Sequence, residues 1–479
     1  MIDWQLLFYR SFNYFCYAII AYVAVINSIY FFLTVMGFYT LRRYHARLTP
    51  EQQEALIRSP LLPEISVIAP AYNESITVRE SVKAMLKLRY PNLQVIVVND
   101  GSRDDTLKIL IDEFRLYRSA RASMGPLPHK PIRGIYESRD PIRLLVVDKE
   151  NGGKADSLNA GLDVARSPLV AAVDSDSLLE PDALLQAVKP FLEDPERMLA
   201  CGGMIRVVNG CQVRNGRVVN ISTSSSIIAL FQSVEYIRAF LGGRVALSFM
   251  NSLLIISGAF GVFRRDAVLA SGGFAVKTVG EDMELVVRLH HQWRERNADY
   301  RIGYVAEPVC WTEVPESTRV LKRQRNRWQR GTVESISLHK GVLLRPKFGL
   351  VGLFAVPYFT LFEMFGPAVE TLGYICTGLG LAVGIISREV AILFFTVSVL
   401  FGMVLSTSAV LLEEFTARRY PRTLDVARLV MVAIVENLGF KQLMTYWRTE
   451  GLIDGLKGKT GWGKMERKGF GTPPAARAS

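Results

Sequence analysis

The sequence predicts an α/β domain with a mostly parallel sheet and helices on both faces, embedded between transmembrane helices. Between residues 65 and 340, short Val- and Ile-rich runs alternate with amphipathic stretches, the pattern of strands joined by crossover helices. Long apolar runs flank this region on both sides. Hydrophobic residues make up 49% of the 479-residue chain, which agrees with a membrane protein that carries a polar domain.

Four strand-like runs share one shape, in which an apolar stretch ends in turn or acidic residues. They are EISVIAP (64–70), LQVIVVND (93–100), IRLLVVDK (142–149) and PLVAAVDSD (168–176). Ligands of parallel α/β sheets bind beyond the carboxyl ends of the strands, so these acidic residues are expected to share one site. Segment 117–140 is rich in Pro, Gly and Arg and lacks periodicity, so an irregular surface insertion is expected there.

The N-terminal apolar run covers residues 12–41 and lacks the cleavage site of a signal peptide. It exceeds the roughly 20 residues that a spanning helix needs. The basic stretch LRRYHAR (41–47) follows directly, so the positive-inside rule places this end in the cytoplasm and the N-terminus outside.

The C-terminal third turns apolar again. Its clearest spans are 367–387 and 390–412, whereas 348–366 and 426–443 each contain a charged residue and fit either spans or interfacial helices. Both alternatives return the basic tail to the cytoplasm. The apolar stretch 245–263 is interrupted by polar and small residues, so a buried strand or helix within the domain is expected rather than a span.

The predicted organisation has five parts. They are an N-terminal transmembrane helix (1–41), a connector (42–64), a cytosolic domain (65–345), a C-terminal membrane region (346–447) and a basic cytoplasmic tail (448–479). The chain is therefore expected in the cell membrane as a multi-pass protein.

The net charge of +12 points to anionic partners, such as lipid head groups, a phosphorylated substrate or nucleic acid. Nucleic acid is not expected, because no nucleic-acid-binding signature appears and the most basic stretch adjoins the membrane segments. The five cysteines are scattered without a CxxC pair, so reduced, unpaired thiols are expected.

Two carboxylates follow the fourth strand-like run, in VDSDS (173–177). A turn beginning at Ser175 can bring Asp174 and Asp176 to one ion, and hard oxygen ligands favour Mg²⁺ or Mn²⁺. Taken alone, the same residues also fit an ordinary turn with two capping side chains.

Two further stretches begin predicted helices. GGKADSLN (152–159) places Lys154 at a helix N-terminus, where free amide groups favour anions, although its spacing is not that of a Walker loop. TVGEDMEL (278–285) places Glu281 and Asp282 at a helix start, where one carboxylate could act as a general base. The plainer alternatives are a Gly-capped helix start and acidic capping.

The most basic stretch, TRVLKRQRNRWQRGT (318–332), is expected to be helical, with Gln324, Arg327 and Trp328 on one face. Arg suits diphosphate oxygens, and Trp suits stacking on a sugar or base. The alternative is a basic helix lying on anionic lipid, and the two interpretations are compatible. The residues expected to remain for the bilayer are Leu321, Lys322, Arg323, Arg325 and Arg330.

In this order, the motifs APAYNES, VVNDGSRDDT, GGKADSLNAGL, VDSDS, GED and QRNRW resemble those of membrane-embedded family 2 glycosyltransferases. That family includes processive synthases of cellulose, hyaluronan and poly-N-acetylglucosamine. The resemblance covers residues 60–335 and implies a GT-A-type fold. The chain departs from the pattern at Gly280, where many members have Thr.

The resemblance implies a role for each matching residue at the donor side. It implies that Asp282 is the catalytic base and that Asp100 contacts the uracil of a UDP-sugar. Lys154 and Asp174 would lie near the nucleotide-sugar, and Asp174 and Asp176 would hold the Mg²⁺ or Mn²⁺, with Asp176 as the direct ligand.

The acceptor side follows in the same way. Gln324, Arg327 and Trp328 would bind the nucleotide diphosphate and, through Trp328, the acceptor end. Ser257 and Gly258 of SGAFGVF (257–263) would line the acceptor site together with Glu281.

The implied reaction is inverting, metal-dependent transfer from a nucleotide-sugar, expected to be a UDP-sugar, to a growing β-linked polysaccharide. One alternative is non-processive transfer of a single sugar to a lipid acceptor. Another is a glycan exporter that the domain merely gates, against which the complete set of acidic residues argues. The expected partners are a nucleotide-sugar donor, a polysaccharide or lipid-linked acceptor and the lipid bilayer, with accessory export subunits compatible with the layout.

Overall fold

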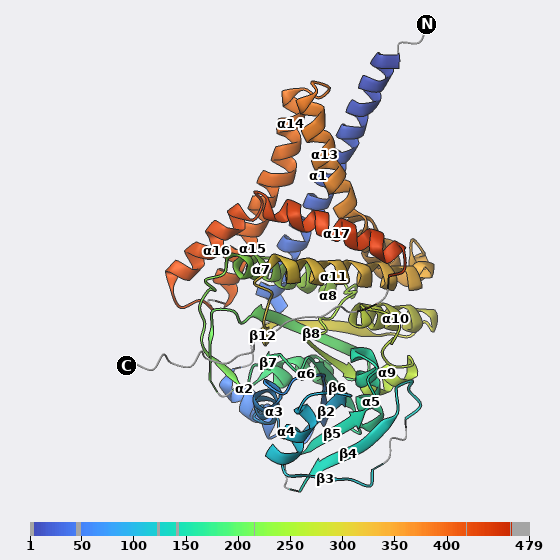
Figure 1. The fold of residues 1–479 in the computed structure, drawn as a ribbon, viewed down its shortest axis with the longest axis vertical. Helices are drawn as coiled ribbons and strands as arrows, with labels where there is room; N and C mark the ends of the chain where they lie inside the picture. Colours follow the sequence, from blue (N-terminus) through green and yellow to red (C-terminus); the bar gives the residue numbers. More distant parts are fainter. Residues whose placement is uncertain are drawn as a thin grey trace.

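A computed structural model describes residues 4–44, 49–121, 125–139, 143–214, 216–417, 419–459 and 461. The sheet domain lies at one end of the molecule, and α1 (Trp4–Tyr44), α13 (Gly366–Ala382) and α14 (Arg388–Phe395) project from the other end as a stalk (Figure 1). A layer of helices separates the stalk from the sheet domain and includes α11 (Thr318–Leu338) and α17 (Phe440–Leu456).

One ten-stranded sheet forms the centre of the domain, in the order β3-β4-β5-β2-β1-β6-β11-β8-β12-β7. Its strands are β1 (Ile65–Ala71), β2 (Leu93–Asp100), β3 (Leu116–Arg118), β4 (Ile132–Ser138), β5 (Leu144–Lys149), β6 (Leu169–Val173), β7 (Leu178–Leu179), β8 (Met198–Val207), β11 (Phe260–Arg264) and β12 (Arg301–Thr312). The four strand-like runs of the sequence become the parallel block β5-β2-β1-β6. This result confirms the expected parallel core, to which β11 adds an antiparallel strand.

The segment 117–140 differs from the expected irregular insertion. Its described part contains β4 and most of β3, which pair antiparallel and extend the sheet beyond β5. β4 is a half-exposed edge region in which only Ile135 is buried, so it lacks the continuous apolar run that marks the central strands. Residues 122–124 and 140 of this segment lie outside the described residues.

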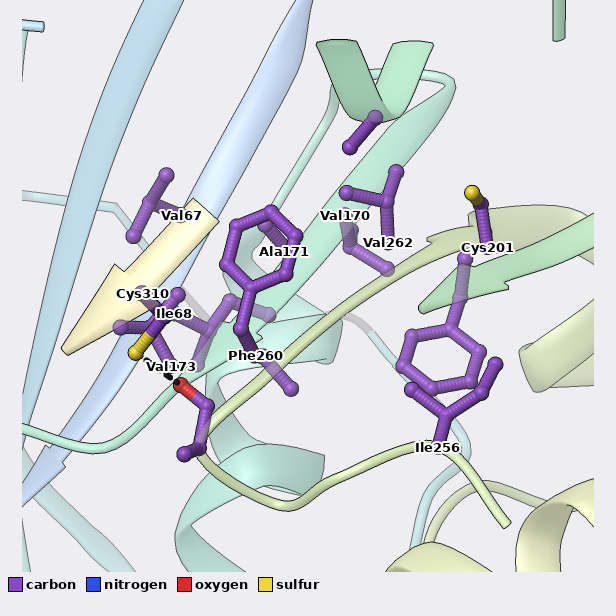
Figure 2. Packing of buried hydrophobic residues seen from close by; sticks show 14 of the residues in the cluster. Val67, Ile68, Val170, Ala171, Val173, Cys201, Ile256, Phe260, Val262 and Cys310 are labelled. Atoms are coloured by element: carbon purple, nitrogen blue, oxygen red, sulfur yellow. Dashed lines mark hydrogen bonds between the residues drawn. The ribbon is translucent and has the colours of Figure 1, made fainter. Parts of the chain in front are cut away.

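The central strands are buried on both faces, as parallel strands between helices must be. Figure 2 shows buried side chains of β1, β6 and β11 in one cluster, among them Val67, Ile68, Val170, Val173 and Phe260. Each of these five side chains is at most 2% exposed. Such packing fixes the strand ends, from which the site is built.

The main helices of the domain follow the strands. They are α3 (Val78–Leu86), α4 (Thr106–Glu113), α5 (Lys154–Val164), α6 (Ala183–Glu193), α9 (Arg265–Ala270) and α10 (Glu281–Glu295). The apolar stretch 245–263 lies within the domain, as expected. It supplies α8 (Arg244–Phe249) and most of β11, and α8 continues α7 (Ile227–Ile237) through the π-helical turn η1 (Arg238–Gly243). All five cysteines are free thiols, also as expected.

In the part of the chain that the structure describes, two helical segments are long and apolar enough to cross a membrane. They are Leu7–Arg43 and Arg388–Thr416, the latter formed by α14, η6 (Thr396–Leu400) and α15 (Phe401–Ala417). The pair Val351–Met364 and Gly366–Ala382, bent by 40°, counts as a third span if it is taken as one. Within the described residues, α16 (Thr423–Val435) and α17 do not pass this test. Figure 1 shows them lying across the base of the stalk, so the stretch 426–443 is divided between two crosswise helices.

Candidate active site

A cavity of about 2030 Å³ opens beyond the carboxyl ends of β1, β2 and β6. It is lined by every residue that the sequence singled out: Asp100, Lys154, Asp174, Asp176, Ser257, Gly258, Glu281, Asp282, Gln324, Arg327 and Trp328. These residues come from positions 100 to 328 of the chain, and the sheet topology brings them to one edge of the sheet. Their individual roles remain predictions.

Asp100 ends β2 and organises the turn before α5. One of its carboxylate oxygens accepts hydrogen bonds from Lys149 Nζ (2.5 Å) and the Gly152 N–H (2.9 Å). The other accepts from Asn151 Nδ2 (3.1 Å) and the Gly153 N–H (2.8 Å). Since Asp100 is only 4% exposed, this buried carboxylate fixes the loop that presents Lys154 to the cavity.

Lys154 lies at the centre of the acidic residues. Its ammonium group is 2.6 Å from Asp174 Oδ1 and 3.4 Å from Glu281 Oε1, and it donates to the Gly258 carbonyl at 3.0 Å. Burial disfavours its charge, but Asp174 and Glu281 outweigh this effect and raise the pKa of Lys154 above its ordinary range. Lys154 is therefore a fixed positive charge that bridges Asp174, directly after β6, and Glu281, the first residue of α10.

Asp282 and Glu281 begin α10 and differ in their surroundings. Asp282 accepts a hydrogen bond from the Gly258 N–H at 2.9 Å and another from the Met283 N–H at 2.8 Å. Burial raises the pKa of Glu281 to about 7, against the opposing charge of Lys154. A Cβ atom on Gly258 would lie 2.8 Å from Lys154 Nζ, so a larger residue there would displace the ammonium group from its observed position.

The start of α10 is held by α11. Glu334 accepts hydrogen bonds from the Thr278 hydroxyl (2.7 Å) and the Val279 N–H (2.8 Å). A Cβ on Gly280 would lie 2.8 Å from the Cα of Gly331. This close approach accounts for glycine at the position where many family members have Thr.

The basic helix α11 is confirmed as a helix, but three of the five residues expected to face lipid are buried, whereas Arg323 is exposed. Leu321 is buried against Met444 and Trp447 of α17, which packs along α11, and Arg325 and Arg330 are buried as well. Arg325 pairs with Glu235 at 2.7 Å, and Arg330 donates to the carbonyls of Lys459 and Gly461 at 2.8 Å. A helix more than a hundred residues away in the chain covers this face, which no local pattern in α11 reveals.

Comparison with known proteins shows that two models of glycosyltransferase domains match this chain. A model described as "Glycosyl transferase family 2" matches residues 66–125, and one described as "Glycosyltransferase like family 2" matches residues 132–331. The chain belongs to glycosyltransferase family 2. The sequence of this glycosyltransferase is similar to the poly-β-1,6-N-acetyl-D-glucosamine synthases of two staphylococci. The Staphylococcus aureus (strain COL) enzyme is 28% identical over 343 residues, 71% of this chain and 69% of the relative. The Staphylococcus epidermidis enzyme is 27% identical over 314 residues, 64% of this chain and 65% of the relative.

Among solved structures, a mannosyltransferase from Pyrobaculum calidifontis, in complex with GDP-Man and Mn²⁺, covers 88% of this chain and 99% of its own. It superposes with a TM-score of 0.50 at 19% identity, a likeness that concerns the fold alone. The expected GT-A-type fold of this family 2 glycosyltransferase is thereby confirmed.

The family 2 fold implies a divalent metal, and two carboxylates here fit one. Asp174 and Asp176 flank Ser175 directly after β6, and both line the cavity. In the described part of the chain, no cluster of three or more His, Cys, Asp or Glu residues could enclose a metal ion. Mg²⁺ and Mn²⁺ need no such cluster, since one or two carboxylates with water and substrate phosphates suffice.

Three further residues line the cavity of this glycosyltransferase but belong to no motif of the sequence: Glu235, Tyr236 and Arg244. Glu235 holds Arg325, whose guanidinium lies 4.2 Å from the centre of the Trp328 ring, and the Tyr236 ring lies 6.5 Å from that of Trp328. Arg244 also lines the cavity. These residues lie in a largely apolar stretch, in which no motif or spacing marks them.

Proposed function

We propose that the chain transfers N-acetylglucosamine from its UDP conjugate to a growing β-linked polysaccharide at the membrane, with inversion at the anomeric carbon. The observation that carries this proposal is the juxtaposition of Asp282, Lys154 and Asp174 in one cavity of a family 2 glycosyltransferase. The names of the relatives support the sugar and the polymer.

In this proposal Asp282 removes the proton from the acceptor hydroxyl, whose oxygen then attacks the anomeric carbon opposite the diphosphate. The hydrogen bond from the Gly258 N–H orients the Asp282 carboxylate for this step. A single displacement needs one base and no covalent enzyme intermediate, and it inverts the anomeric configuration. Glu281, which is buried beside it and contacts Lys154, supports the charge balance of the site.

Lys154 and Arg327 stabilise negative charge on the leaving UDP through preorganised positive charge. Asp174 and Asp176 would hold Mg²⁺ or Mn²⁺, which supplies further positive charge at the diphosphate when bound. Asp100 acts on the donor side by holding the turn that carries Lys154, and its contact with uracil stays a prediction.

The extent of the cavity supports a polymer rather than a single sugar as product. From Asp282 the cavity continues to Glu363 and Glu370 of the C-terminal membrane region and to Arg448 of α17. A cavity that extends from the proposed base to these charged residues suits a glycan chain that stays bound between additions. Basic residues Arg42 and Arg43 at the end of α1 support a cytoplasmic catalytic domain and an external N-terminus. Accessory export subunits fit this arrangement as further partners.

A donor screen on the purified chain tests the proposal. UDP release is measured with UDP-N-acetylglucosamine, UDP-glucose, UDP-galactose and UDP-glucuronate, with Mg²⁺, Mn²⁺ or a chelator, and the product is sized by gel. We expect metal-dependent release with UDP-N-acetylglucosamine and a long product. A short, lipid-linked product would instead establish the alternative, transfer of a single sugar to a lipid. Release of UDP from none of the donors would refute the proposal.

A further inference from the structure

Arg244 shares a cavity with the proposed catalytic base, Asp282. It is the first residue of α8, directly after the π-helical turn η1, and its side chain lines the cavity. Its guanidinium carbon lies 3.8 Å from the centre of the Phe240 ring, one helical turn earlier. Stacking on an aromatic ring holds the guanidinium plane in one orientation and leaves its edge for hydrogen bonds.

Most other buried cations of the cavity have a carboxylate partner. Lys154 pairs with Asp174, Arg325 with Glu235, and Arg448 with Glu363. Among the residues that the structure describes, none accepts a hydrogen bond from Arg244, and its Nη1 is buried without a partner. Burial accordingly lowers the pKa of Arg244. An unsatisfied buried donor costs stability, so its presence in a cavity wall indicates a ligand.

The surroundings of Arg244 narrow the chemistry of that ligand. Asp282 is near enough to act electrostatically on Arg244, together with the phenols of Tyr236 and Tyr304. The carboxylate of Asp282 already balances positive charge here, so a second anion is disfavoured. Apolar side chains of Leu247 and Ile255 line the cavity as well. An uncharged group with an oxygen and an apolar part fits this combination.

A second unsatisfied polar group lies in the wall of the same cavity. Gln324 of α11 is 8% exposed, and its Oε1 is buried without a hydrogen-bond partner. The cavity therefore carries a free donor on α8 and a free acceptor on α11, with the Trp328 ring, which is 41% exposed, on the same helix as Gln324. A donor, an acceptor and an aromatic surface are what a sugar ring requires for recognition.

We propose that Arg244 contacts the terminal sugar of the acceptor chain and donates hydrogen bonds to an uncharged exocyclic oxygen, such as the acyl oxygen of an acetamido group. This contact turns the attacking hydroxyl toward Asp282. Arg244 is thus a specificity-determining residue for the acceptor, an assignment that rests on the proposed glycosyl transfer. A deacetylated sugar would present an ammonium group to Arg244 and would be repelled.

The test compares Arg244→Met and Arg244→Lys with the wild type, all as full-length chains in detergent. Arg301→Met serves as the matched control, because Arg301 is exposed and outside the cavity. UDP release from UDP-N-acetylglucosamine is measured against rising concentrations of a β-linked N-acetylglucosamine oligosaccharide and of its deacetylated counterpart. Acceptor-independent donor hydrolysis and thermal stability are recorded for each variant.

For Arg244→Met we expect the acceptor KM to rise about 10- to 100-fold, the effect of losing a charged hydrogen bond. The donor KM and donor hydrolysis should stay at wild-type values, and the preference for the acetylated acceptor should vanish. Arg244→Lys should retain part of that preference. Thermal stability of Arg244→Met should equal or exceed that of the wild type, since an unpaired buried charge is removed.

Unchanged acceptor KM and unchanged preference in Arg244→Met would overturn the assignment. So would equal losses of donor and acceptor binding, or a fall in thermal stability that accounts for the lost activity. A wild type that releases no UDP from any donor would instead refute the proposed function, and the assignment of Arg244 with it.

Discussion

Gly280 and Gly331 meet backbone to backbone, where the turn before α10 touches α11. A Cβ atom on either glycine would lie within 3.0 Å of the Cα of the other. The contact joins the helix that carries the proposed base to the helix that carries Gln324, Arg327 and Trp328. The two halves of the site are therefore held in one fixed relation.

Gly280→Ala is expected to destabilise the chain, because the added methyl group meets backbone that cannot move aside. Overpacking of this kind costs about 1–3 kcal/mol. Thermal unfolding in detergent, followed by intrinsic fluorescence, measures the loss. Gly341→Ala is the matched control, since no atom lies within 4 Å of a Cβ built there. Equal melting temperatures for the two variants would show that the contact is looser than described.

Asp100→Asn is expected to weaken UDP binding as well as stability. The substitution removes one of the two carboxylate charges that face the completely buried Lys149, the other being Asp156. It also removes one acceptor of the hydrogen bonds that hold residues 151–153. Loss of a hydrogen bond to a charged group corresponds to about a tenfold or greater rise in the UDP Kd. Isothermal titration with UDP gives the value. Asp112→Asn, at an exposed position on α4, should bind UDP like the wild type.

Glu281 predicts a pH dependence of stability. Burial raises its pKa from 4.5 to about 7, so between these values the folded state binds more protons than the unfolded state. Its contribution to stability is therefore fully present below its unfolded pKa and is lost as pH rises through about 7.

The comparison that isolates this effect is the melting temperature of the wild type minus that of Glu281→Gln, measured from pH 5 to pH 8. We expect this difference to fall as pH rises. Glu196→Gln, whose parent residue is exposed in the turn after α6, controls for general effects of acid on the chain. A difference that stays constant or rises over the range would contradict the raised pKa.

Much of the fold and the site followed from the sequence because the deciding signals are local. Buried parallel strands are continuous Val- and Ile-rich runs, and the turns after β2 and β6 carry Asp100 and Asp174 at the ends of those runs. Lys154 and Asp282 begin helices with glycine directly before or near them. These elements needed only the general rule that parallel strands align their carboxyl ends.

The features that the sequence did not predict depend on contacts between distant segments. β4 joins the sheet through pairing with β5, although its own pattern is that of a half-exposed edge. Arg325 is buried and pairs with Glu235 of α7, and Leu321 is buried under α17. Arg244 lies in a largely apolar stretch, and its role can be inferred only from the cavity that it lines.

The most direct test of the account is UDP release and UDP binding by Asp282→Asn, beside the wild type and the surface control Asp299→Asn. The substitution removes the proposed base while preserving side-chain size and the packing of α10. General-base catalysis contributes about 10²- to 10⁴-fold, so turnover should fall by that factor with an unchanged UDP Kd. Wild-type turnover in Asp282→Asn, with UDP still bound, would contradict the assignment of Asp282 as the base.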